Sequence, residues 1–119
     1  MEKVKVVFEV KYDFRPEYEA PYMATIVARI PKDEDGMIPL ELREKDEEVF
    51  GEELIAYWGN SRGNYRVVEG DVTGTSWKEV ERRVEEVIEE AVNTLRKVKQ
   101  RNVEALKTKP TDKVYVYEI

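Results

Sequence analysis

Two aromatic residues and two arginines, of the types that contact nucleic acids, stand close together in the chain: Trp58, Arg62, Tyr65 and Arg66. An aromatic ring can stack on an unpaired base, and a guanidinium group can pair with a phosphate. The glycines and asparagines between them predict a turn, so these side chains would lie at the tip of a hairpin. An ordinary hairpin whose aromatic side chains fill the core explains the same pattern, and both interpretations stay open.

Histidine and cysteine are both absent from the 119 residues, and only two serines occur, Ser61 and Ser76. Histidine is the commonest general base and metal ligand, and cysteine supplies thiolate nucleophiles and disulfides. Any catalysis would have to use carboxylates, lysine, tyrosine or threonine. These absences argue against an enzyme, and we expect no cofactor and no metal site.

The acidic stretch 33–48 is the one place where a cation stays open as an alternative. Asp33, Asp35 and Gly36 match inner positions of a calcium-binding EF-hand loop. The first and last ligand positions of that loop would be Pro31 and Leu42, and neither can supply the required carboxylate. The EF-hand pattern therefore fails, and a solvated loop is the simpler interpretation.

The charge balance bears on the possible partners. The formal net charge is −6, and charged residues make up 39% of the chain. A negative protein is repelled by nucleic acid and by anionic membranes. There is no apolar run long enough to cross a bilayer and no signal-peptide pattern, so we expect a cytoplasmic protein. The abundance of Glu, Lys, Arg and Val without cysteine is typical of heat-adapted proteins.

A long helix is predicted over about residues 76–107. Ser76 and Glu79 form a capping box, in which the serine oxygen accepts from the amide of Glu79 and the glutamate reaches back to the amide of Ser76. Apolar residues recur within an arc of about 100°, which suits a helix packed on a core. Pro110 ends the element. Asn102 lies within the apolar arc, where it marks the end of the packed part or sets the register against a partner helix.

The order of charges along this helix predicts self-association. Its first half is rich in glutamate and its second half in lysine and arginine. An antiparallel crossing of two copies near Val92 would place Glu86 opposite Lys99 and Glu89 opposite Arg96. The alternative is that these charges complement the helix dipole and face solvent.

Alternation of apolar and polar residues predicts the strands that this helix covers. The expected strands are 3–14, 22–30, 53–58, 65–69 and 113–119, with a helical turn as the alternative before the third. The first two form a hairpin, and so do the next two. The predicted fold class is α+β: a single domain, 1–119, with an antiparallel sheet of about five strands in the order β-β-β-β-α-β and one long helix across it.

The function that this sequence favours is a non-catalytic interaction module that self-associates, with a homodimer as the expected assembly. A small-molecule binding domain with its pocket between sheet and helix is the alternative. A nucleic-acid-associated protein that uses the hairpin tip 58–66 is a further one.

Overall fold

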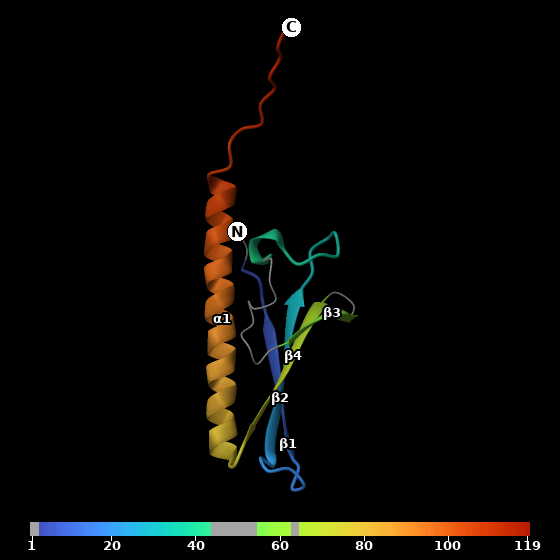
Figure 1. Cartoon of the computed structure of the whole chain (residues 1–119), viewed down its shortest axis with the longest axis vertical. Coiled ribbons are helices and arrows are strands. Elements are labelled where there is room, and N and C mark those ends of the chain that lie inside the picture. The colour runs from blue at the N-terminus through green and yellow to red at the C-terminus, as the bar shows by residue number, and fades with distance from the viewer. Residues whose placement is uncertain (1–2, 44–54, 63–64) are drawn as a thin grey trace.

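The computed structural model describes residues 3–43, 55–62 and 65–119, and the arrangement of their elements is shown in Figure 1. The elements in chain order are strand β1 (Val7–Phe14), strand β2 (Tyr22–Pro31), a short 3₁₀ helix η1 (Leu40–Leu42), strand β3 (Ile55–Arg62), strand β4 (Tyr65–Gly74) and helix α1 (Trp77–Lys107). The prediction of an antiparallel sheet with one long helix is confirmed. Predicted positions 44–54 and 63–64 lie outside the described residues.

Strand β2 is the interior strand of the sheet. On one side it pairs antiparallel with β1, from Phe14 opposite Tyr22 to Val7 opposite Arg29. On its other side it pairs antiparallel with β4 over its whole length. Both of its edges are therefore hydrogen-bonded, and its alternate residues are buried on one face and partly buried on the other.

Strand β3 lies at the outer edge of β4, so the described strands follow the order β1-β2-β4-β3. Its two ends pair regularly, Ile55 with Glu69 and Arg62 with Tyr65. The register is irregular between Ala56 and Ser61. Three strands, β1, β2 and β4, thus make the continuous part of the sheet, with β3 as an irregular fourth.

The prediction of about five strands in the order β-β-β-β-α-β is wrong for the last strand. Residues 113–119 pair with no strand in the described part of the chain and have no regular secondary structure. The physical reason is the length of α1: 31 residues span about 46 Å. The helix therefore carries the chain past the sheet before it ends, and the following residues leave in the same direction (Figure 1).

At the start of α1 the predicted contact of Ser76 is present, whereas the predicted contact of Glu79 is replaced by another. The Ser76 oxygen accepts a hydrogen bond from the amide of Glu79 at 3.2 Å, as predicted. The carboxylate of Glu79 accepts instead from the amide of Thr75 at 3.0 Å and from its hydroxyl at 2.8 Å. The glutamate thus ties down the residue one position earlier than a capping box does.

The core lies between the sheet and one side of α1. Alternate residues of β2 are completely or almost completely buried against it, and they are Ala24, Ile26, Ala28 and Ile30. The helix contributes residues spaced three and four apart, as an amphipathic helix must: Val80, Val84, Val87, Ala91, Leu95 and Val98. The alanines on the two sides of this contact, Ala24, Ala28 and Ala91, are completely buried.

An aromatic cluster closes the end of the interface where α1 begins. Trp77 packs edge-on against Tyr22, with ring centroids 4.9 Å apart, and against Tyr12 at 5.9 Å. Phe14 contacts Tyr22 at 5.1 Å. Edge-to-face pairs of this kind stabilise a contact beyond the area they bury. Tyr12, Phe14 and Trp77 keep 40–48% of their surface exposed, so the cluster covers this end from outside.

The molecule is elongated, with extents of 77 × 30 × 25 Å and a radius of gyration of 19.2 Å. A compact chain of this length has a radius of gyration of about 13.5 Å. The excess comes from the end of α1 and the residues after it, which extend beyond the sheet (Figure 1).

Candidate interaction surfaces

An open groove of about 540 Å³ lies between the beginning of the chain's first strand and the middle of α1. Residues 3–8 form one wall, and Val92 and Leu95 of the helix form the other. Among the described residues, β1 has a strand neighbour on one side only. Of these wall residues only Val7 and Phe8 belong to β1, so the groove meets the start of a strand edge whose outward N–H and C=O groups have no described strand to bond. We call it the β1 groove.

The β1 groove is apolar at its base and basic at its rim. Its described lining contains seven apolar residues and four cations, the latter being Lys3, Lys5, Arg96 and Lys99. No carboxylate is present among these lining residues. In a chain with a net charge of −6 this is a local reversal of sign, and it favours an apolar ligand or segment that carries negative charge.

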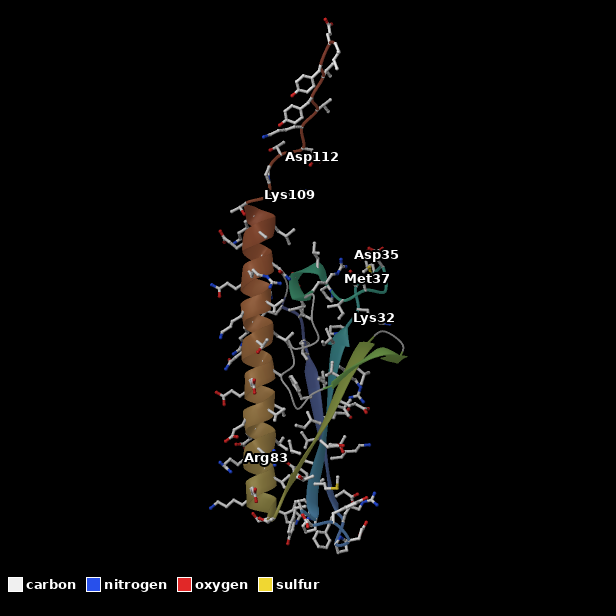
Figure 2. The ribbon with its side chains drawn as sticks, in the orientation of Figure 1. Lys32, Asp35, Met37, Arg83, Lys109 and Asp112 are labelled. Carbon is white, nitrogen blue, oxygen red and sulfur yellow. The ribbon has the colours of Figure 1, made fainter. Side chains whose placement is uncertain are left out.

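The second feature is the stretch after the helix, residues 108–119, which we call the trailing segment. Figure 2 shows Lys109 and Asp112 on it, beyond the end of α1 and away from the sheet. Its apolar side chains are almost fully exposed: Val114 89%, Tyr115 70%, Val116 84% and Tyr117 79%. Alternating valine and tyrosine is a sequence typical of a strand. The segment has strand character but joins no sheet in the described part of the chain.

The residues predicted for self-association do not share one face of α1. Glu86 lies exposed and pairs with Arg82 one turn away, at 3.6 Å. At about 100° per residue, Glu86 and Lys99 point about 140° apart. Arg96 and Lys99 instead lie together at the rim of the β1 groove, and Glu89 is exposed. The proposed Glu86–Lys99 and Glu89–Arg96 pairs stay a prediction, and the groove is the feature that the sequence did not indicate.

The predicted nucleic-acid contact residues lie on β3 and β4. Arg62 is opposite Tyr65 in the strand register, and Arg66 is opposite Ser61. Trp58 falls in the irregular part of β3, between the two regularly paired ends. The backbone thus places Arg62, Tyr65 and Arg66 at the closed end of one strand pair. Their side chains lie outside the described part, and a role in binding stays a prediction.

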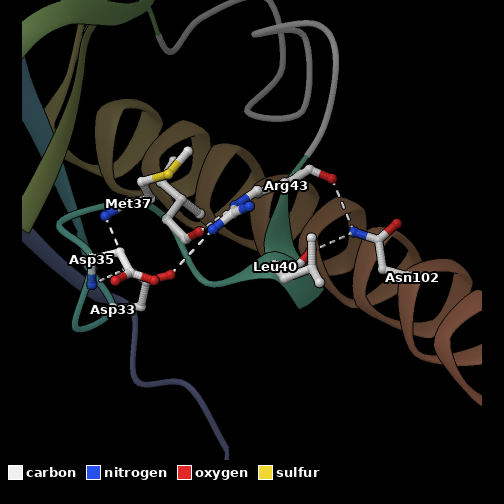
Figure 3. A network of polar contacts seen from close by, with 7 residues as sticks. Asp33, Asp35, Met37, Leu40, Arg43 and Asn102 are labelled. Atoms are coloured by element: carbon white, nitrogen blue, oxygen red, sulfur yellow. Dashed lines mark hydrogen bonds and ion pairs between the residues drawn. The ribbon is translucent and has the colours of Figure 1, made fainter.

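A polar network that the sequence did not predict fixes the loop after β2 to α1 (Figure 3). The side-chain nitrogen of Asn102 donates to the carbonyls of Leu40, Glu41 and Arg43, at 3.2, 3.1 and 2.9 Å. Asn102 comes after Val98, the last buried residue of α1, and its side chain bonds within its own chain; a role in setting register against a partner helix stays a prediction. Asn102 holds the end of η1, whose last carbonyls need donors.

Asp33 organises the other end of the same loop. Its carboxylate accepts from the amides of Asp35 and Met37, at 2.9 and 3.0 Å, and from Arg43 at 3.1 Å. These hydrogen bonds, first that from Met37, lower the pKa of Asp33. Gly36 has a φ of 73°, the left-handed conformation that this tight turn requires.

The cation alternative for the acidic stretch gains no geometric support from its described part. Both carboxylate oxygens of Asp33 are used by the loop itself. Among the described residues, no group of three or more acidic side chains could hold a metal ion. Positions 44–48 of the stretch lie outside the described residues.

Comparison with protein-family models, with curated proteins and with solved structures finds no match for this chain. No helix in the described part combines the length and the apolar character that crossing a bilayer requires. The two structural features that bear on function are thus the β1 groove and the trailing segment.

Proposed function

We propose that this chain is a non-catalytic interaction module that associates with a second copy of itself. The observation that carries the proposal is the trailing segment, whose valines and tyrosines stand in solvent although they have the pattern of a strand. Each such side chain contributes about 1.5–3 kcal/mol when it is transferred from water into a packed interface. A soluble monomer gains nothing from four of them in a row.

The elongated shape supports the same proposal. The last turns of α1 extend past the sheet, and Leu106 there is 40% exposed. Contiguous exposed apolar surface of this kind usually marks an interaction site. An association that covers both the end of α1 and the trailing segment would bury apolar side chains that do not pack in the described core.

The chemistry of the chain fits a module without catalysis. General acid–base and nucleophilic sites are built most often from histidine and cysteine, and the chain has neither. Asp33 and Glu79, whose pKa values are lowered, are held by hydrogen bonds of a local turn and of a helix cap. Such shifts belong to structural hydrogen bonds rather than to a reacting centre.

Native mass spectrometry combined with light scattering tests the proposal on the full chain. The monomer has a mass of 14.0 kDa. Between about 1 and 100 μM, the measured mass should rise toward twice that value as the concentration increases. A mass that stays monomeric over the whole range, at low and at high salt, would refute self-association.

A small-molecule binding domain is the second candidate, and the β1 groove is the observation that favours it. Its volume of about 540 Å³ lies within the range of about 300–1,000 Å³ typical of ligand pockets. The groove is lined by residues 3–8 and by α1, at one edge of the sheet. An extra mass retained by the monomer in native mass spectra would favour this candidate over self-association.

A further inference from the structure

We propose that the trailing segment of one copy docks as an added strand in the β1 groove of a second copy, and that the exchange is reciprocal. The inference rests on the proposed self-association and names the surfaces that carry it. It follows from three observations: a strand edge with no described neighbour, a strand-like segment that joins no described sheet, and an acidic residue, Glu118, on that segment that suits a basic groove.

The backbone chemistry of the two surfaces matches. Alternate residues of an edge strand point their N–H and C=O groups outward, where an extended segment can bond them. Val7 and Phe8, the first residues of the edge strand β1, line the β1 groove, and residues 3–6 continue its wall without regular secondary structure. Residues 113–119 are about as long as β1, which has eight residues, since seven extended residues span about 23 Å. An added strand would complete a ladder on both partners.

The side chains also match. The groove offers an apolar base, including Val92 and Leu95, and the segment offers valines and tyrosines that alternate between its two faces. Glu118 brings a negative charge to a rim that holds four cations and no described acid, while Lys113 lies at the opposite end of the segment, next to the connection. Opposite charges at the rim of an interface steer association and fix its register.

The direction of the segment favours a second copy as the source of the docked strand. The groove reaches α1 at Lys99, and α1 continues for eight residues beyond it, about 12 Å, before it ends at Lys107. From there the segment runs away from its own sheet (Figure 1). Residues 108–112, with Pro110 among them, form an extended connection of about 17 Å. The trailing segment of one copy is therefore accessible to a second copy.

A reciprocal exchange would bury enough surface for a stable dimer. Two-fold symmetry uses each contact twice, so four tyrosines enter the interface. Tyrosine buries about 150–250 Å² per residue, which gives about 600–1,000 Å² from these side chains alone. A specific interface needs about 1,000–1,200 Å² in total. The valines and the ladder backbone add to the tyrosine area.

The first experiment compares Val116→Pro with Thr111→Pro in the full chain. Proline at 116 removes a ladder donor in the middle of the added strand, whereas proline at 111 lies in the connection. Neither position packs against the described core, so both variants should keep the helical circular dichroism of the parent. Val116→Pro should weaken dimerisation by about 10-fold or more, and Thr111→Pro should leave it within a few-fold of the parent.

The second experiment identifies the partner surfaces. Because the chain has no cysteine, a single introduced thiol is unique. Tagged Lys5→Cys and untagged Val116→Cys chains are mixed and treated with a short bis-maleimide. A cross-linked species that contains both chains is expected. Lys97→Cys, on the outer side of α1, replaces Lys5→Cys in the control and should give little product.

The outcomes separate this inference from the proposal beneath it. A full chain that is monomeric throughout refutes both. A dimer that Val116→Pro leaves unchanged, or that gives no Lys5–Val116 cross-link, refutes the strand exchange and keeps self-association. A double variant, Lys5→Cys with Val116→Cys in one chain, is treated in the same way. If it cross-links within the chain while the mixed single variants do not cross-link, the segment folds back on its own groove, and the exchange is refuted.

Discussion

The side-chain amide of Asn102 donates a 2.9 Å hydrogen bond to the backbone carbonyl of Arg43, a residue 59 positions earlier in the chain. Asn102 also reaches the carbonyls of Leu40 and Glu41, so one side chain on the helix serves the whole end of η1. This contact joins the second half of α1 to the loop that follows β2. It holds the helix in place beyond the part that packs on the sheet.

Replacing Asn102 by alanine should therefore destabilise the fold and loosen the loop. The partly buried carbonyls would lose their donor, which costs about 1–3 kcal/mol of unfolding free energy. Amide exchange in residues 38–43 should quicken more than exchange in β2. Asn93→Ala, at an exposed position of the same helix, is the control and should change stability by less than about 0.5 kcal/mol. Equal effects of the two substitutions would contradict the structural role of Asn102.

The acid limb of stability should depend on Glu79. Hydrogen bonds from the amide and then from the hydroxyl of Thr75 favour the ionised carboxylate and lower its pKa. A lowered folded-state pKa contributes stability that is present above the unfolded-state pKa and is lost as the pH falls through the folded-state value.

Urea unfolding measured from neutral to acid pH checks this expectation. Glu79→Gln should lower stability at neutral pH and make the profile flatter on the acid side. Glu81→Gln removes the same charge from the same turn while the Thr75–Glu79 contacts remain, and it should keep the acid limb. A parent-like profile in Glu79→Gln would exclude this carboxylate as the source.

Ala91 should tolerate no larger side chain. It is completely buried where α1 meets the sheet. Leucine there would overpack a filled interface and cost about 1–3 kcal/mol. Ala105→Leu, at an exposed position near the end of α1, should leave the unfolding free energy nearly unchanged. If thermal unfolding showed Ala91→Leu to be neutral, the helix would have to sit farther from the sheet than described.

Gly74 is a second point of close approach, between the end of β4 and the start of α1. A Cβ atom at this position would lie 3.0 Å from Cγ2 of Val80 and 3.1 Å from Cδ of Glu79. Contacts this short force the neighbours to move. Gly74→Ala should therefore lower the melting temperature. Gly36→Ala should also lower it, for the separate reason that its φ of 73° is unfavourable for a residue with a side chain. An unchanged melting temperature in Gly74→Ala would mean that the turn relaxes freely.

The trailing segment should contribute nothing to the stability of the isolated monomer. Its side chains pack against no described residue, so Tyr115→Ser and Tyr117→Ser together should leave the melting temperature unchanged under dilute conditions. At high concentration, where the dimer forms, the same variant should melt below the parent. A lower melting temperature in the dilute monomer would place the segment on its own sheet.

Local signals in the sequence were sufficient for several elements. The alternation of β1 and β2 and the serine cap of α1 depend on residues close together in the chain, and the structure follows them, except that the first strand, predicted from residue 3, begins at Val7. Ser76 accepts from Glu79 as predicted, because the helical turn itself brings the two groups together. The preference of Glu79 for Thr75 rather than Ser76 was not predictable, because it depends on how β4 enters the helix.

The candidate site was predicted only in part. Arg96 and Lys99 were chosen for their charge, and the structure places them at the rim of the β1 groove. Their neighbours Lys3 and Lys5, some 90 positions earlier, carry no sequence signal that links them to the helix. For the same reason the donors and acceptors around Asn102 were missed. A signal that could have indicated a role for Asn102 was its place within the apolar arc.

The sequence by itself determined the element types, the long helix and the limits on chemistry, since these depend on residue type and short-range periodicity. Only the tertiary structure decided that β4 lies beside β2 and that α1 extends past the sheet. The same packing left residues 113–119 exposed and opened a basic groove along β1. Strand order, overhang and grooves depend on which distant surfaces bury each other, and that free energy is not encoded in any local pattern.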